Sequence, residues 1–231
     1  MIQLYSWATP NGHKVHILLE ETGLDYRVHP IDIGAGEQFS PEFLAISPNN
    51  KIPAILDEEG PDGKPFPLAE SGAILLYLAE KTRCFLPADR PNYYLTLQWL
   101  MFQMGHIGPM LGQAHHFRSY APVRQSYPIE RYTQEAHRLY GILDRRLRES
   151  NYLAGPEYGI ADIATFPWLR AHDTQGVRLQ DYPHLQHWYA TIDARPAVQR
   201  GLAVLAQESH RHVDEATRLE NLFGSTQYRR R

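Results

Sequence analysis

Short apolar runs alternate with helical patterns over the first third of the chain. Strand patterns lie at residues 2–5, 26–31, 52–57 and 66–68. Helical patterns lie at residues 13–21, 41–46 and 71–81. Gly23 stops the first helix, and Asp62 with Gly63 predicts a hairpin turn between the last two strands. The pattern therefore predicts the element order β-α-β followed by β-β-α.

Strand patterns stop after residue 91, and long helical patterns replace them. These patterns lie at residues 93–117, 129–149 and 160–171, and two more begin at Tyr182 and Pro196. The change predicts an α/β domain at residues 1–83 and an all-helical domain at residues 91–206. Residues 207–231 are polar and end in three arginines, so we expect a mobile or loosely attached tail there.

Composition and charge narrow the function classes. The chain has 231 residues, with 23 Lys and Arg against 26 Asp and Glu, for a formal net charge of -3. Polyanion binding depends on an excess of basic groups, so nucleic acid is not an expected partner. No apolar run reaches the roughly 18 residues that a membrane span needs, and the first residues lack a signal-peptide pattern. We expect a soluble, cytoplasmic protein with no membrane partner.

The chain contains one cysteine, Cys84. A single cysteine provides no internal disulfide, no C-x-x-C redox pair and no structural zinc site, so any thiol chemistry must use a sulfur from elsewhere. Cys84 follows an apolar helix with no base beside it in sequence, and we expect it to be a buried or semi-buried small hydrophobe.

Histidine pairs do not predict a metal site. Adjacent His115 and His116 would point about 100° apart on a helix, and they are read as ordinary helix residues or as part of the substrate cavity. His184 and His187 lack a nearby carboxylate or cysteine that would complete a site. We expect no bound metal.

A polar turn at residues 9–12 leads directly into the first helix. Such a turn presents unpaired backbone N–H groups and the positive end of the helix dipole, which stabilise an anion. The Thr9 hydroxyl and the Asn11 amide are donors suited to a thiolate that the protein itself does not contain. The alternative is that both residues only cap the helix and shape the turn.

Two further polar segments precede apolar elements. Glu70 could pair with an ammonium group and Ser71, read as a helix cap, with a carboxylate, so together they suit the zwitterionic end of an amino acid. The alternative is a simple helix cap. The extended segment that begins at Lys51 could pair with the backbone of a peptide ligand, and Lys51 could meet a carboxylate.

These motifs together resemble the bacterial glutathione transferase family, and within it the Nu-class members that act as glutathione-dependent disulfide-bond oxidoreductases. The resemblance covers about residues 1–205. The motifs are Thr9-Pro10-Asn11-Gly12, residues 47–55, residues 70–78, residues 97–100, residues 108–113 and residues 115–117. One departure is Gly159, which stands where the family usually has a Ser or Thr cap, at a cost of a few tenths of a kcal/mol.

The resemblance implies a thioredoxin-like N-terminal domain with a mixed sheet, an all-α C-terminal domain and a homodimer. It assigns thiol activation to Thr9 and Asn11, and gives no role to a metal. The implied glutathione-binding residues are Gln38 and Lys51 at the glycyl end, Ile52 beside a cis Pro53 at the ligand backbone, Glu70 and Ser71 at the γ-glutamyl end, and Arg131 from the helical domain.

The expected reaction is thiol-disulfide exchange, in which glutathione is a co-substrate and its bound thiolate attacks a disulfide. The main alternative is conjugation of the same thiolate to a small electrophile. A second alternative is a binding or scaffold protein that keeps the fold without turnover. Thiol-disulfide exchange and conjugation both use the same glutathione-binding half of the site, so the sequence alone separates them poorly.

Overall fold

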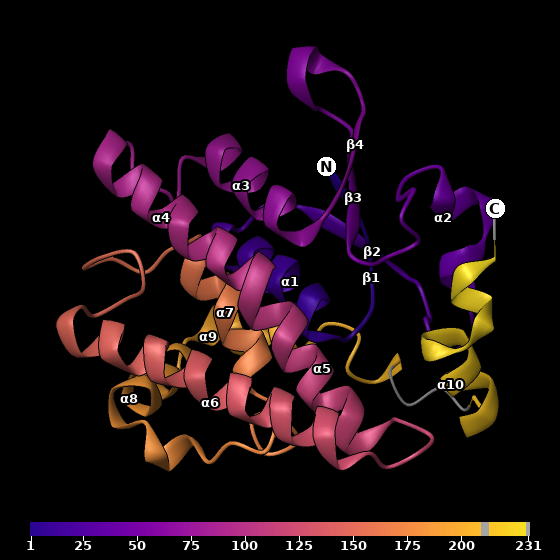
Figure 1. Ribbon diagram of the computed structural model, residues 1–231. Coiled ribbons are helices and arrows are strands. Elements are labelled where there is room, and N and C mark those ends of the chain that lie inside the picture. Colours follow the sequence, from indigo (N-terminus) through magenta and orange to yellow (C-terminus); the bar gives the residue numbers. More distant parts are fainter. Residues whose placement is uncertain (209–212, 230–231) are drawn as a thin grey trace. The chain divides into compact units, whose positions relative to one another are not determined.

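The computed structural model describes residues 1–208 and 213–229. Its contacts divide the chain into two compact units, Met1–Ile74 together with Arg200–Arg231, and Leu75–Gln199. Figure 1 shows the elements of both units. The division in contacts falls inside α3 (Ser71–Thr82), just before the change in element type that the sequence predicts. The domain boundaries at residues 83 and 91 stay predictions.

The first unit contains a four-stranded mixed sheet in the order β2-β1-β3-β4. The strands are β1 (Ile2–Ser6), β2 (Tyr26–Pro30), β3 (Ala54–Asp57) and β4 (Phe66–Ala69). β1 is parallel to β2 and antiparallel to β3, and β3 is antiparallel to β4. Leu4 pairs with Val28 and Ile55, and both Leu4 and Ile55 are fully buried. The two central strands therefore carry the core, and the predicted βαβ-ββα fold is confirmed.

Helix α1 (Pro10–Thr22) follows β1 and is buried over most of its length. It ends at Gly23, whose φ of 67° is left-handed and whose N–H donates to the Leu19 carbonyl. Helix α9 (Pro196–Ala203) approaches α1 closely, because a Cβ added at Gly201 would lie 2.7 Å from the Ile17 Cα. Glycine is needed there to let the two backbones meet.

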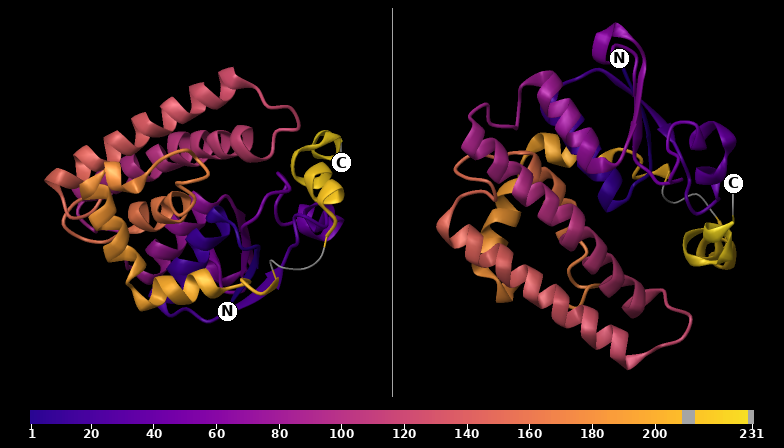
Figure 2. Two further views of the ribbon diagram at one scale, coloured as in Figure 1. Left: turned by 90° about the horizontal axis from the view of Figure 1, so that it is seen from below. Right: turned by 45° about the horizontal axis from the view of Figure 1, so that its top comes forward.

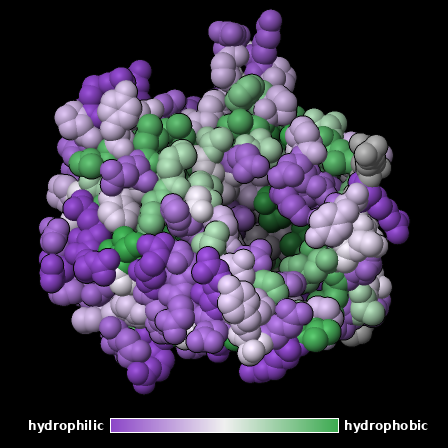
Figure 3. Space-filling model, in the orientation of Figure 1, coloured by the Kyte–Doolittle hydropathy of each residue, from purple (hydrophilic) through white to green (hydrophobic). Residues whose placement is uncertain are grey.

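The connection between β3 and β4 is a polar hairpin turn. Its 3-10 turn η2 (Pro61–Gly63) is exposed, and Asp62 and Gly63 adopt positive φ of 61° and 69°. These are the residues that predict the turn. Figure 3 shows that the tip of this hairpin, at the top of the view, is hydrophilic.

The second unit is helical in its regular elements. Its helices are α4 (Arg90–Phe102), α5 (Gly108–Ser119), α6 (Ser126–Glu149), α7 (Ile160–Leu169) and α8 (Pro183–Asp193). A π-helical turn, η3 (Gln103–Ile107), joins α4 to α5, so the helix expected at residues 93–117 consists of three segments. The buried side of α6 is a stripe of residues at helical spacing. Its members are Ala136, Leu139, Tyr140, Leu143 and Leu147. The predicted all-helical half is confirmed.

A buried carboxylate organises the start of α7. Asp162 is fully buried, and its Oδ1 accepts from the Leu153 N–H at 2.9 Å and from the Trp188 Nε1–H at 2.8 Å. Its Oδ2 accepts from the Gly159 N–H at 3.1 Å. Burial raises the pKa of Asp162 to about 6, and the three hydrogen bonds oppose that rise. Asp162 therefore accepts the Gly159 N–H, which lies just before α7, and the helix start is capped although Gly159 has no side chain.

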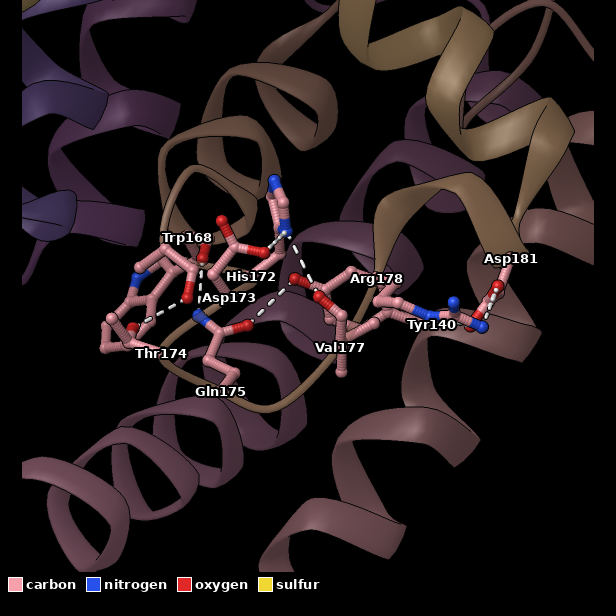
Figure 4. A network of polar contacts seen from close by, with 10 residues as sticks. Tyr140, Trp168, His172, Asp173, Thr174, Gln175, Val177, Arg178 and Asp181 are labelled. Carbon is pink, nitrogen blue, oxygen red and sulfur yellow. Dashed lines mark hydrogen bonds and ion pairs between the residues drawn. The ribbon is translucent and has the colours of Figure 1, made fainter.

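The segment that joins α7 to α8 is held by a polar network (Figure 4). The hydroxyl of buried Tyr140 donates to Gln175 Oε1 at 2.8 Å, and Gln175 Nε2 donates to the Trp168 carbonyl at 2.7 Å. His172 Nδ1 lies 3.1 Å from the Val177 carbonyl. Burial raises the pKa of Tyr140 well above its usual value, so its phenol keeps the proton that it donates.

The C-terminal segment contains a helix that the sequence pattern does not predict. Helix α10 (Glu215–Phe223) begins after Asp214, whose side chain accepts from the Thr217 N–H, and the 3-10 turn η6 (Ser225–Tyr228) follows it. Ala216, Leu219 and Leu222 recur at helical spacing, although no side chain of α10 is buried. The Asp214 cap and acidic Glu215 are the sequence signals that could have identified the helix.

Candidate functional site

Four segments meet at one end of the sheet. Parallel strands β1 and β2 pair Ser6 with Pro30, so both strands leave the sheet at this end. Ala54, the first residue of β3, pairs with Tyr5 of β1 and with Ala69, the last residue of β4. The segments after β1, β2 and β4 and the segment before β3 therefore lie together. They carry every predicted site residue except Arg131.

Thr9 is the residue before α1, and its side chain has two roles. It adopts an extended conformation (φ -128°, ψ 163°), and its Oγ1 accepts from the Gly12 N–H at 3.2 Å. The Thr9 side chain therefore caps α1. A hydroxyl that accepts this bond still has its own proton to donate, so capping α1 leaves Thr9 able to donate to an anion.

Asn11 lies in the first turn of α1 and is half-buried. The following residue must be glycine, because a Cβ on Gly12 would lie 2.1 Å from the Trp7 carbonyl oxygen and 2.8 Å from Ser6 Oγ. The turn is thus drawn tightly onto the end of β1. Thr9 and Asn11 are placed by this turn at the positive end of the α1 dipole.

Ser71 is the first residue of α3, one position later than the expected cap. Glu70 precedes it with a positive φ of 69°, and its carbonyl accepts from the Ile74 N–H at 2.9 Å. Glu70 is exposed, whereas Ser71 is buried. The pair therefore places a carboxylate in solvent beside a buried hydroxyl at a helix N-terminus, an arrangement that can bind an ammonium and a carboxylate.

A buried lysine supports Ser71 from α1. Lys14 is 1% exposed, and its Nζ donates to Ser71 Oγ at 3.2 Å. Burial lowers the pKa of Lys14 to about 7, while the Glu70 carboxylate opposes that shift. The sequence analysis missed Lys14, because nothing in the local pattern of α1 indicates that a cation faces the start of α3.

Ile52 and Pro53 are joined by a cis peptide bond, as the resemblance implies. Ile52 is half-buried and lies just before the stretch of β3 that pairs with β1, which begins at Ala54. Ser47 Oγ donates to the Lys51 carbonyl at 2.8 Å and fixes the preceding turn. This segment is therefore a turn held directly before the start of β3.

Gln38 and Lys51 both contact the C-terminal segment. Gln38 is 2% exposed in η1 (Glu37–Phe39), and its Nε2 donates to the Ile33 carbonyl at 3.1 Å and to the Asn221 carbonyl at 3.3 Å. Lys51 is exposed, and its Nζ donates to Gln227 Oε1 at 2.7 Å. Partial burial lowers the pKa of the Lys51 amine.

Arg131 and Cys84 belong to the helical unit. Arg131 lies on α6 and is exposed. Cys84 is also exposed, so the expectation of a buried or semi-buried side chain is wrong. The residue follows the end of α3, where Arg83 and Phe85 adopt positive φ of 56° and 61°, and this tight turn leaves its thiol at the surface. Apolar neighbours in sequence did not reveal that turn.

Histidines at the start of α1 do not form a metal site. His16 Nε2 lies 2.8 Å from Ser6 Oγ, and burial, together with neighbouring His13, lowers the pKa of His16 to about 3. Across residues 1–208 and 213–229, no three His, Cys, Asp or Glu side chains are grouped to hold a metal ion. In the same ranges, every helix is too short or too polar to cross a membrane.

Comparison with known proteins gives matches over most of the chain. The glutathione S-transferase N-terminal domain model matches residues 1–80, and the C-terminal domain model matches residues 117–196. Disulfide-bond oxidoreductase YfcG of Escherichia coli is 53% identical over 87% of this chain and 94% of its own length. Disulfide-bond oxidoreductase YghU of the same organism is 44% identical over 88% of this chain and 74% of its own.

Solved structures give the same picture. A glutathione transferase from Pseudomonas putida, with one glutathione disulfide bound per subunit, has a TM-score of 0.84 and 50% identity over 88% of this chain and 91% of its own. A family member from Pseudomonas fluorescens, with two glutathiones bound, has a TM-score of 0.83 and 50% identity over 87% of this chain and 92% of its own. The two domain models match the chain in the order N-terminal, then C-terminal, and relatives about 50% identical cover nearly the whole chain. The chain therefore belongs to the glutathione S-transferase family.

Proposed function

We propose that the chain is a glutathione-dependent disulfide-bond reductase of the Nu class. The observation that carries the proposal is the Thr9 turn, which offers a hydroxyl donor and a helix N-terminus to a thiolate and has no protein thiol in its unit. The two E. coli relatives are named disulfide-bond oxidoreductases, and the P. putida relative holds glutathione disulfide, the product of such a reaction.

The proposed site has a contact for each part of the tripeptide glutathione. Ser71 and Glu70 take the carboxylate and the ammonium of the γ-glutamyl end, and the Lys14 amine behind Ser71 favours the carboxylate in its protonated form. The backbone at Ile52 pairs with the cysteinyl residue, which directs the sulfur towards the turn at Thr9 and Asn11.

The remaining assignments concern the glycyl end and the helical unit. Gln38 and Lys51 take the glycyl carboxylate. Arg131, an exposed residue of α6, stays a residue that the resemblance implies. The homodimer and the cytoplasmic location that the resemblance and the sequence suggest are part of the same proposal. Sedimentation of the purified protein and fractionation of cells test these two points.

The reaction proceeds in two exchanges. A glutathione thiolate held by Thr9 and Asn11 attacks one sulfur of a disulfide, forms a mixed disulfide and releases the other sulfur as a thiolate that takes a proton from water. A second glutathione thiolate attacks the glutathione sulfur of the mixed disulfide, forms glutathione disulfide and releases the second thiol. Two glutathiones are oxidised and one disulfide is reduced, without a protein cysteine.

The decisive experiment compares two reactions of the purified protein. Reduction of 2-hydroxyethyl disulfide by glutathione tests disulfide exchange, and reaction of glutathione with 1-chloro-2,4-dinitrobenzene tests conjugation. We expect disulfide reduction to dominate. Conjugation as the only measurable activity would overturn the assignment in favour of a transferase, and glutathione binding without either activity would indicate a scaffold.

Replacing Cys84 with serine should leave disulfide reduction unchanged. The thiol is exposed in the helical unit, and the proposed reaction draws both of its nucleophilic sulfurs from glutathione. The measurement is kcat/KM for glutathione and for 2-hydroxyethyl disulfide in Cys84→Ser. A large loss in kcat, with the melting temperature preserved, would mean that the protein supplies a nucleophile and would contradict the mechanism.

A further inference from the structure

The surface around Gln38 and Lys51 is covered by the chain's own C-terminal segment. We propose that residues 214–228 compete with the glycyl end of glutathione for this surface, so that the tripeptide must displace them to bind fully. The inference rests on the proposed function, because it takes Gln38 and Lys51 as the glycyl-end residues. Figure 2 shows α10 in yellow, and hydrogen bonds join it to Gly34 and Gln38, which precede α2 (Pro41–Leu44).

Asn221 is the centre of the contact. Its side-chain Nδ2 donates to the Gly34 carbonyl at 2.8 Å, and its main-chain carbonyl accepts from Gln38 Nε2. The approach is close, because a Cβ added at Gly36 would lie 3.2 Å from Asn221 Nδ2. Gln227 also donates to the Asn221 carbonyl, which holds η6 against the end of α10.

The contact uses up the donors of Gln38. A glutamine amide has two N–H groups, and here one goes to the Ile33 carbonyl and the other to the Asn221 carbonyl. The bond to Ile33 lies within the loop that carries Gln38. A ligand carboxylate can therefore obtain an N–H from Gln38 only when Asn221 gives it up.

Lys51 is left ready for another partner. The Lys51 ammonium, a cation, is paired with the neutral amide oxygen of Gln227. A carboxylate would form a stronger, charge-assisted bond with Lys51 than this amide does.

The docked segment is also weakly held. Helix α10 has nine residues, and within it no side chain is buried. Isolated helices shorter than about 12 residues are marginal in water, and each net hydrogen bond contributes only about 0.5–1.5 kcal/mol. A carboxylate that binds Lys51 and Gln38 can therefore offset the loss of the hydrogen bonds that tie the segment to Gly34, Gln38 and Lys51.

The test uses thiol-free probes and the full chain. S-methylglutathione carries the glycyl carboxylate, and γ-glutamyl-S-methylcysteine lacks the glycyl residue. The double variant Asn221→Ala, Gln227→Ala removes the side-chain bonds to Gly34 and Lys51 that hold the segment, and keeps the main-chain carbonyl that Gln38 contacts. We expect S-methylglutathione to bind this variant about fivefold to tenfold more tightly by calorimetry, since about 1–1.4 kcal/mol of competition is removed. Affinity for γ-glutamyl-S-methylcysteine should not change. Gln207→Ala, an exposed amide before the segment, is the matched control.

A locked variant tests the converse. A Cβ added at Gly34 would lie 3.3 Å from Arg218 Cγ, so Gly34→Cys with Arg218→Cys, in a Cys84→Ser background, can tie α10 to its surface. When oxidised, this protein should bind S-methylglutathione at least fivefold more weakly than the same protein when reduced, by the same competition. Both forms should bind γ-glutamyl-S-methylcysteine equally.

The outcomes separate the two proposals. Unchanged or weaker S-methylglutathione binding in the alanine variant, or equal binding by the oxidised and reduced locked protein, would overturn the competition and leave the proposed function intact. Failure of the unaltered chain and of every variant to bind either probe would overturn the proposed function itself.

Discussion

Replacing Thr9 with valine is expected to lower kcat/KM for glutathione-dependent reduction of 2-hydroxyethyl disulfide by about 10- to 100-fold. Valine keeps the shape of threonine and removes the hydroxyl. A hydrogen bond to a charged group contributes about 1.5–3 kcal/mol, and that range corresponds to the expected loss in rate. The pKa of the bound glutathione thiol should rise in parallel, measured by the ultraviolet absorbance of the thiolate during a pH titration.

Serine at this position is the control, because Thr9→Ser keeps both the cap and the donor and should retain most of the activity. Loss of the cap in the valine variant costs about 0.5–2 kcal/mol of stability, which thermal unfolding measures separately. The donor role is ruled out if the valine variant folds and keeps the thiol pKa and kcat/KM of the unaltered chain.

Replacing Asp162 with alanine is expected to lower the free energy of unfolding by about 3–5 kcal/mol. The reason is that one fully buried carboxylate accepts three hydrogen bonds, from the N–H groups of Leu153 and Gly159 and from the Trp188 indole. Alanine would leave all three donors buried without a partner. Denaturant unfolding measures the effect, and Asp25→Ala, at an exposed aspartate, should have almost none.

The same residue gives this destabilisation a pH dependence. The folded pKa of Asp162, about 6, lies above the ordinary value of 3.8, so the folded state binds this proton more tightly than the unfolded state. The contribution of Asp162 to stability therefore falls as pH rises between those two values and is flat outside them. The destabilisation by alanine should be larger near pH 4 than near pH 7; an equal loss at both would show that the pKa is not raised.

The local sequence determined most of the elements. Alternation and helical spacing located the four strands and the main helices, because each buries one face and burial selects apolar residues at a fixed period. Gly23 and the pair Asp62 and Gly63 marked turns correctly, since positive φ is cheap for glycine and tolerated by aspartate. The motif at Thr9 predicted a helix cap, and the resemblance predicted the cis bond before Pro53.

Tertiary structure decided two features that the sequence did not predict. These are the position at which α10 docks and the exposure of Cys84. α10 buries none of its side chains, and its bonds to Gly34 and Gln38 join residues almost two hundred positions apart. Exposure of Cys84 depends on a tight turn that its apolar neighbours do not encode.

The candidate site depends on both the local sequence and the tertiary structure. Sequence named Thr9 and Asn11 as candidate donors because their chemistry is local, a polar turn before a helix. Only the pairing of the strands brought that turn beside Pro53 and Ser71, and only the packing of α1 placed the Lys14 amine against Ser71. Local patterns record which residues a segment buries, whereas the partners of a polar side chain depend on strand register and helix packing across the whole unit.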